Sequence, residues 1–404
     1  MKNSKIKASV IAVAAFAVSS AAMAQSSVTL YGMLDSSIGY TSNVGGKSLV
    51  AMEGGASGSN KWGMKGQEDL GGGLKAVFKI ENGFNIGNGK IGGQGPIAFN
   101  AAGAQTRSLF NRQAFVGLSS DQYGTVRLGR QLDAVTEMVQ GLTGDNISAY
   151  AFSTPGDVDN NDNTTNQNNA VKYITPVIAG FQAEGAYSFG GVAGSNGQNQ
   201  SWSVAADYAQ GGLTVAGGYF RADSDANSFW GNATAQPSFG NALGYAPAGY
   251  NQGVAFKKAG IAQIAGQYQF GQFTAGLRYS NAQYQGNPVA GQNSIHFNVI
   301  GALLQYQANA ALSLAAGYTY VYGSAAANFD PNTNTHTTKF ANSTMSSTNQ
   351  ASLGATYSLS KSTSVYAMGA YVHAQGAFAS AADSGNTASG GTQWKANVGM
   401  YHSF

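Results

Sequence analysis

From Ser27 onward, apolar and polar residues alternate along the chain, segment after segment. In the first of these segments, Val28, Leu30 and Ile38 share one parity, whereas Thr29 and Asp35 have the other. A period of two is typical of a β-strand whose two faces meet different surroundings. The pattern therefore predicts strands with one apolar face and one polar face.

The alternation returns in later segments, which are residues 74–84, 181–189, 202–208, 273–279, 312–322, 351–359 and 394–404. In the last of them, Trp394, Val398 and Phe404 carry the apolar parity to the final residue. A terminal strand with an apolar face needs a docking partner, because termini that are not tied down fray. The parity of residues 299–306 is ambiguous, so a bulge and a mixed register both stay open there.

Connections between these segments alternate between short and long. Short ones include residues 210–212 and 270–272, whereas long ones rich in Gly, Asn and Ser include 132–168 and 223–256. Short turns at one end and long loops at the other are typical of a transmembrane β-barrel. We expect an all-β antiparallel barrel of about sixteen strands, in which the last strand closes against the first.

Composition separates this fold from a soluble β-sandwich, which also alternates. Charged residues make up only 10% of the chain, and the mean hydropathy is −0.15. A sandwich exposes its polar face to water and carries more charge, near ~25% in an average soluble domain. Low charge without a run of ~20 apolar residues favours a barrel that turns alternate side chains toward lipid.

The first residues predict export. Lys2, Lys5 and Lys7 precede an apolar run that closes on the A-x-A pattern at 22–24. We interpret residues 1–24 as a cleaved signal peptide and 25–404 as the barrel domain. The whole chain has 21 basic and 18 acidic residues, so without the three signal lysines the balance is 18 to 18. That balance gives no support for a nucleic-acid partner, and without cysteine no disulfide forms.

Enzymatic chemistry and bound metals find little support. The four histidines are His296, His336, His373 and His402, and no nucleophile motif accompanies any of them. The acidic run 157–163 resembles a calcium loop but lacks its Gly and its closing Glu, so calcium binding stays open. We expect no enzyme, no cofactor and no dedicated metal site. A passive pore and a surface-interaction barrel, either an adhesin or a receptor with a narrow lumen, remain as functional classes.

Several stretches in combination resemble the general diffusion porins of Gram-negative outer membranes. They are "KWGMKGQEDLGGGLKAVFKIENGF", "FNRQAFVGLSSDQYGTVRLGRQ", "NAVKYITPVIAGF" and the closing "VGMYHSF". The resemblance implies a homotrimer of sixteen-stranded barrels in outer-membrane lipid and lipopolysaccharide, passing small hydrophilic solutes and ions. It also implies that the third long loop folds into the lumen, and that Phe404 helps the outer-membrane assembly machinery recognise the last strand. Small residues expected on outward faces, which are Gly32, Ser36, Gly66 and Gly117, suit a packed trimer interface.

The third loop carries only negative charge. Between Gln131 and Ala170 there are six acids and no base. Asp133, Glu137 and Asp145 are the predicted acidic side of a constriction. Opposed rows of charge across a narrow waist bias the passage of ions.

Basic residues flank the loop in the predicted strands. Those predicted to form the basic wall are Lys61, Lys65, Arg112, Arg130 and Lys172, of which the family resemblance singles out Lys61, Arg112 and Arg130. Arg127 and Arg130 have opposite parity, so they cannot both face the lumen from one regular strand. The resemblance favours Arg130 and the alternation favours Arg127, which leaves this choice open. The sign of the ion selectivity also stays open.

Overall fold

A computed structural model of the chain describes residues 26–91, 108–163, 166–223, 258–285, 294–325, 329–330, 335–336, 346–375 and 388–404. The proposed signal peptide lies outside these residues. Within them, no helix is both long enough and apolar enough to cross a membrane.

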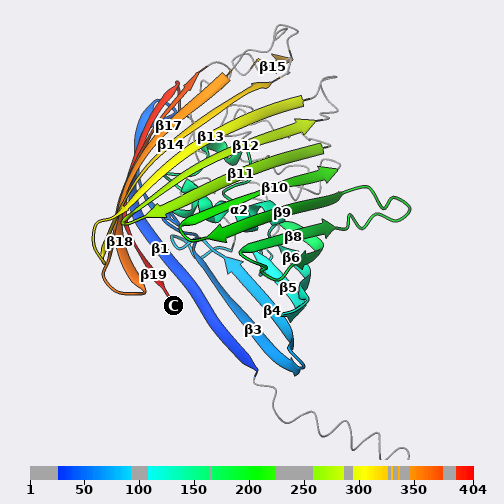
Figure 1. Ribbon diagram of the computed structural model, residues 1–404. Helices are drawn as coiled ribbons and strands as arrows, with labels where there is room; N and C mark the ends of the chain where they lie inside the picture. The colour runs from blue at the N-terminus through cyan, green and yellow to red at the C-terminus, as the bar shows by residue number, and fades with distance from the viewer. Residues whose placement is uncertain are drawn as a thin grey trace, which may run out of the picture.

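One antiparallel sheet dominates the fold, and its strands lie side by side with a common tilt (Figure 1). Its strands are β1 (Ser27–Val44), β2 (Lys47–Gly54), β3 (Lys61–Gly71), β4 (Leu74–Gly83), β5 (Gln113–Ser120), β6 (Gly124–Gln131), β7 (Gln167–Ile174), β8 (Phe181–Ser188), β9 (Gln200–Gln210), β10 (Leu213–Asp223), β11 (Lys258–Phe270), β12 (Phe273–Gln285), β13 (Ser294–Gln307), β14 (Leu312–Ala325), β17 (Ser346–Ser358), β18 (Thr363–Gln375) and β19 (Thr392–Ser403). A separate two-stranded sheet pairs β15 (Phe329–Asp330) with β16 (Thr335–His336).

The sheet closes on itself, because β19 pairs with β1 from Met33↔Ser403 to Thr41↔Lys395. Its 17 segments fill sixteen positions, since β3 pairs with the first half of β1 and β2 pairs with the second half. Between these two segments, residues 55–60 leave the strand. The Asp35 carboxylate accepts hydrogen bonds from the backbone N–H groups of Ser57 and Gly58, each at 2.7 Å, which holds the interruption in place. The predicted sixteen-stranded closed barrel is confirmed.

The two faces of each strand follow the predicted alternation. In β19, Trp394 and Val398 are 58% and 66% exposed on the outside of the barrel, whereas Lys395 and Asn397 are buried on the inside. The ambiguous stretch in β13 is regular: Val299 and Leu303 face inward, Ile300 and Leu304 are exposed, and the pairing with β12 has no shift. Its mixed composition arises because apolar side chains occupy both faces there.

Two of the small residues expected at a trimer interface make room for aromatic side chains of the same chain. A Cβ on Gly32 would collide with the Phe404 ring, and one on Gly66 would lie 2.5 Å from the Phe78 ring. The placement of Gly117 on the outside is wrong. Its neighbours Val116 and Leu118 are the exposed residues, so Gly117 faces the lumen and pairs with Arg127.

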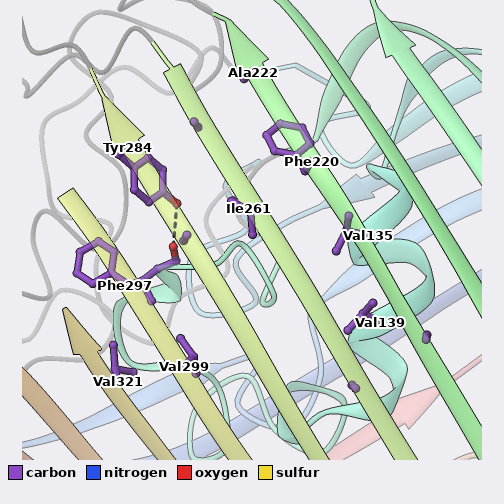
Figure 2. Close-up of a cluster of buried hydrophobic side chains, with 14 of the residues drawn as sticks. Val135, Val139, Phe220, Ala222, Ile261, Tyr284, Phe297, Val299 and Val321 are labelled. Atoms are coloured by element: carbon purple, nitrogen blue, oxygen red, sulfur yellow. Dashed lines mark hydrogen bonds between the residues drawn. The ribbon is translucent and has the colours of Figure 1, made fainter. Parts of the chain in front are cut away.

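The interior is filled by the segment between β6 and β7. It contains α2 (Ala134–Val139), η2 (Gln140–Leu142), η3 (Gly144–Asn146) and η4 (Pro155–Asp157), and α2 contacts β8 to β11. This segment is the third long loop of the sequence, and we call its described residues 132–163 the internal loop. It supplies Val135, Val139 and Val158 to a buried cluster with the inward faces of the wall (Figure 2).

Candidate functional site

The internal loop begins with a capped helical turn. The Asp133 carboxylate accepts hydrogen bonds from the backbone N–H groups of Val135 and Thr136 at 2.8 and 3.0 Å, which makes it the N-cap of α2. Its other oxygen accepts the Thr136 hydroxyl at 2.7 Å and the Asn160 side-chain amide at 3.3 Å. Asp133 is therefore buried inside the loop and ties the outgoing half of the loop to its returning half.

The loop then packs against the wall through apolar side chains. Val135 and Val139 of α2 lie beside Phe220 of β10 and Ile261 of β11, as Figure 2 shows. On the return, the Tyr284 hydroxyl of β12 donates to the backbone carbonyl of Val158 at 2.8 Å. These contacts cover the inward faces of β10 to β13 with loop residues.

The tip of the loop is held on the opposite stretch of the wall. Lys395 Nζ of β19 donates to the Tyr150 carbonyl at 2.5 Å, and Gln350 Nε2 of β17 donates to the Ser153 carbonyl at 2.8 Å. The Ser148 hydroxyl donates to the Ala56 carbonyl at 2.6 Å, so the interruption between β2 and β3 supports the tip. The internal loop therefore contacts the barrel wall along the strands from β8 to β19 and on to β1.

A buried ionic latch joins the loop to β12. Arg278 Nη1 lies 3.6 Å from Asp145 Oδ2 and 3.4 Å from Asp159 Oδ2, and the Arg278 side chain is only 6% exposed. Arg278 Nη2 also donates to the Thr154 hydroxyl, and the Ser280 hydroxyl donates to Asp159 at 2.5 Å. Burial raises the pKa of Asp145, although Arg278 opposes this rise. We call Arg278, Asp145 and Asp159 the latch.

No role was predicted for Arg278, although the sequence contains a signal for one. In "QFTAGLRYS", Arg278 has lumen parity on a stretch of wall with few charges. A lone inward-facing cation needs an anionic partner when it is buried. Three conditions together, lumen parity, isolation and an acid-rich loop, could have identified the pairing.

Glu137 is the loop acid that meets the basic wall. Its carboxylate lies 2.8 Å from Arg127 Nη1 of β6 and 2.5 Å from Lys172 Nζ of β7. Lys172 is fully buried and also contacts Glu184 of β8 at 3.0 Å. Burial alone would raise the pKa of Glu137, but Lys172 and Arg127 outweigh it and hold that pKa below its ordinary value.

A second group of bases faces the lumen from β3, from β4 and from Arg112, the residue before β5. Arg112 Nε lies 2.6 Å from Glu81 Oε1, and Lys79 Nζ lies 3.4 Å from Glu81 Oε2. In the part of the chain that the structure describes, neither Lys61 nor Lys65 forms an ion pair. Positive charge therefore exceeds negative charge on this stretch of wall.

The parity question between Arg127 and Arg130 has a structural answer. Arg127 faces the lumen, since it bonds Glu137 and lies over the Phe115 ring with 4.9 Å from Cζ to the centroid. Arg130 follows Gly129, whose φ of +135° interrupts the regular strand, and the pairing with β7 shifts there, so alternation no longer excludes Arg130 from the lumen. Its guanidinium donates to the Asn111 carbonyl at 2.7 Å and to the Asn168 side chain. Arg130 is thus tied to the residue beside Arg112.

The predicted site residues are only partly brought together. Lys61 and Lys65 lie on β3, and Arg112 directly precedes β5 on the other side of β4. Lys172 joins Glu137 in a separate buried cluster. Asp133 is buried by hydrogen bonds within the internal loop, and Asp145 is buried in the latch. Among the described residues, no group of three or more His, Cys, Asp or Glu side chains is placed to hold a metal ion.

Comparison with known proteins identifies relatives along most of the chain. A profile of the family described as "Gram-negative porin" matches residues 8–377. An outer membrane porin protein of Bordetella pertussis is 31% identical over 425 residues, with 95% of this chain and 96% of that protein covered. Outer membrane porin protein 32 of Delftia acidovorans is 36% identical over 192 residues, with 46% of this chain and 50% of that protein covered.

Solved structures share the barrel at low sequence identity. The anion-selective porin from Comamonas acidovorans superimposes with a TM-score of 0.69 at 20% identity, covering 94% of this chain and 100% of that chain. In-vitro folded OmpT of Vibrio cholerae gives a TM-score of 0.61 at 16% identity, covering 94% and 98%. At these identities the two structures support the fold alone.

Proposed function

This chain belongs to the Gram-negative porin family and is a diffusion channel of the outer membrane, and we propose that its waist lies between the internal loop and the basic wall and favours anions. The passage in this proposal runs along the inward faces of β3 to β7. Lys61, Lys65, Arg112 and Arg130 supply its positive charge.

The observation that carries the proposal is an imbalance of charge between the two sides. Asp133 caps α2, Asp145 and Asp159 meet Arg278, and Glu137 meets Arg127 and Lys172. These acids are held by hydrogen-bond or ion-pair partners, whereas Lys61 and Lys65 have no carboxylate partner among the described residues. A charged wall of low dielectric constant concentrates counter-ions. The name of the Comamonas acidovorans relative, an anion-selective porin, agrees with this sign.

The test is the reversal potential of single channels in a salt gradient. We expect anion preference in the wild type and a shift toward cations in the variant Lys61→Gln, Arg112→Gln, Arg130→Gln. Lys361→Gln, in the short turn between β17 and β18, is the matched control and should leave the reversal potential unchanged. Because the Debye length falls from ~8 Å at physiological salt to ~3 Å at 1 M, the shift should shrink at high salt. Cation preference in the wild type would refute the proposal.

The role of the internal loop as the constriction has its own test. Deleting residues 133–161 should enlarge the solute cutoff and leave a closed barrel, since backbone pairing of the strands does not depend on the loop. Liposome swelling with sugars of increasing size measures the cutoff. An unchanged cutoff in a properly inserted barrel would show that the loop is not the constriction.

We further propose a homotrimer. OmpT of Vibrio cholerae has been solved in a trimer form, and the family resemblance points the same way. Native mass measurement in mild detergent should give three copies. Monomer alone would contradict the trimer and leave the channel assignment intact.

A further inference from the structure

We propose that Tyr31, Lys65 and Lys79 form a discrete binding subsite for small oxyanions, which are carboxylates or phosphate, on the lumen wall. The inference rests on the proposed passage of anions and adds a defined stopping point below the waist. We call these three residues the oxyanion subsite.

The two lysines are direct neighbours across strands. The register of β3 with β4 pairs Lys65 with Lys79, and both have lumen parity. Directly opposed side chains have Cβ atoms ~5 Å apart, so two ammonium groups can reach one small ligand. Like charges placed opposite each other repel, and such a pair is expected to need compensation.

Tyr31 provides part of that compensation. Lys65 Nζ lies over the Tyr31 ring at 5.4 Å from its centroid, and Lys79 Nζ lies over the same ring at 5.7 Å. An aromatic ring attracts a cation through its quadrupole but supplies no counter-charge. The ring therefore holds both ammonium groups in place and leaves their N–H donors available for an anion.

The position of the ring is built into the wall. Tyr31 pairs with Gly63 across β1 and β3, and a Cβ on Gly63 would lie 2.9 Å from the Tyr31 hydroxyl oxygen. The ring can therefore extend over β3 toward β4, where its hydroxyl donates to Glu81 Oε2 at 2.7 Å. A glycine and a buried carboxylate together set the ring between the two lysines.

The local charge leaves a place for an anion. Glu81 is the nearby carboxylate, and Arg112 Nε contacts it at 2.6 Å, closer than Lys79 Nζ at 3.4 Å. Lys65 has no ion-pair partner among the described residues and is exposed, and the Lys79 side chain is 25% exposed. The two ammonium groups thus have only Glu81 nearby, and Glu81 is closer to Arg112. They suit an oxyanion, because its several oxygens can accept hydrogen bonds from both ammonium groups at once.

The subsite also lies where a permeating anion would meet it. Lys65 is four residues beyond Lys61 on β3, which is ~13 Å at 3.3 Å per residue, toward the short turn at 71–73. That end of the barrel also holds Ser27 and Phe404, the described ends of the first and last strands. An anion that has passed Lys61 would reach the subsite next on its way to that end.

The experiment is a blocking titration on single channels. Chloride current is measured while acetate or inorganic phosphate is added, and the half-blocking concentration is recorded. We expect saturable block in the wild type and a roughly tenfold higher half-blocking concentration in Lys65→Gln, Lys79→Gln, the loss expected from removing charge-assisted hydrogen bonds. The anion that blocks at the lower concentration identifies the preferred class.

Three further variants separate the subsite from general charge. Lys75→Gln removes one lumen charge that lies 3.5 Å from Asp121, and it should leave the block unchanged. Tyr31→Phe keeps the ring but loses its bond to Glu81, so it should weaken the block less than Tyr31→Leu, and neither variant changes any charge. The single variant Lys65→Gln changes only an exposed side chain. Its half-blocking concentration therefore tests the subsite even where the double variant assembles poorly.

The outcomes distinguish the subsite from the proposed function. Anion preference with no saturable block by either probe, or a double variant that behaves like Lys75→Gln, overturns the subsite and leaves anion passage standing. Cation preference in the wild type overturns the proposed function itself, and the subsite with it.

Discussion

Replacing Arg278 with glutamine should free the internal loop from β12 while the barrel stays closed. The Arg278 side chain is 6% exposed, and both carboxylates that it contacts are fully buried. Glutamine retains hydrogen-bonding capacity but removes the one cation of the latch. Asp145 and Asp159 would then be two buried negative charges without compensation.

The expected size of the effect follows from the latch geometry. Removing one partner of a buried ion pair costs about 3–5 kcal/mol, because it leaves an uncompensated buried charge. Each neutral hydrogen bond that remains, such as those of Gln350 and Tyr284 to loop carbonyls, contributes only ~1 kcal/mol. At ~1.4 kcal/mol per tenfold change, the docked state should lose roughly two to three and a half powers of ten in population relative to the undocked state.

Lowering the pH should reduce this loss of the docked population. Burial already raises the pKa of Asp145, and a protonated carboxyl group needs no cation. Single-channel recording measures the loss as current fluctuations, and liposome swelling measures it as a larger sugar cutoff. Arg278→Lys keeps the charge and should behave nearly as the wild type. The variant Arg278→Gln, Asp145→Asn, Asp159→Asn removes all three charges and should restore much of the docking. Quiet channels with the wild-type cutoff in Arg278→Gln would refute the reasoning.

Three other residues give separate expectations. Asp133→Ala should loosen the loop by about 0.5–2 kcal/mol, the usual value of an N-cap, whereas Asp133→Asn keeps the cap, and channel noise compares the two. Glu137 has a lowered pKa when docked beside Lys172 and Arg127, so its contribution is present above the undocked pKa and is lost as pH falls through the docked pKa. Channel noise should therefore rise in acid, and Glu137→Gln should remove that pH dependence. Phe404→Ala should reduce barrel assembly in cells but not refolding in detergent, measured by heat modifiability, since the backbone bonds to Gly32 remain.

The barrel could be predicted because its cause is local in sequence. Alternation places Val28 and Ile38 outside and Asp35 inside regardless of what lies across the barrel. The same reasoning favoured Arg127 for the lumen, where its side chain lies. The prediction is wrong at Gly117, whose small size suits a packed outer surface but does not determine which side of the wall it faces. Alternation with its two exposed neighbours would have placed Gly117 inside, so parity was the better guide.

The internal loop could not be predicted at the same level, because its contacts join residues far apart in the chain. Arg278 meets Asp159 across 119 positions, and Gln350 meets Ser153 across 197. No periodicity connects such pairs. The interruption at 55–60 is equally non-local in its effect, since it supports Ser148 through the Ala56 carbonyl. The charge of the loop could be read from the sequence, but the direction in which each carboxylate points could not.

That direction changes the electrostatic reasoning. Counting six acids on a loop opposite a basic wall predicts a strong transverse field. In the structure, however, Asp133 caps a helix and Asp145 and Asp159 share Arg278, so these carboxylates are buried in hydrogen bonds and ion pairs. A buried carboxylate that is held by a cation or by hydrogen-bond donors acts more weakly on a passing ion, and salt screens the interaction further beyond ~8 Å. Among the described residues, Lys61 and Lys65 have no ion-pair partner that offsets their charge. In the proposed function, Asp133, Glu137, Asp145 and Asp159 therefore hold the shape of the passage, and the bases of the wall determine which ions enter it.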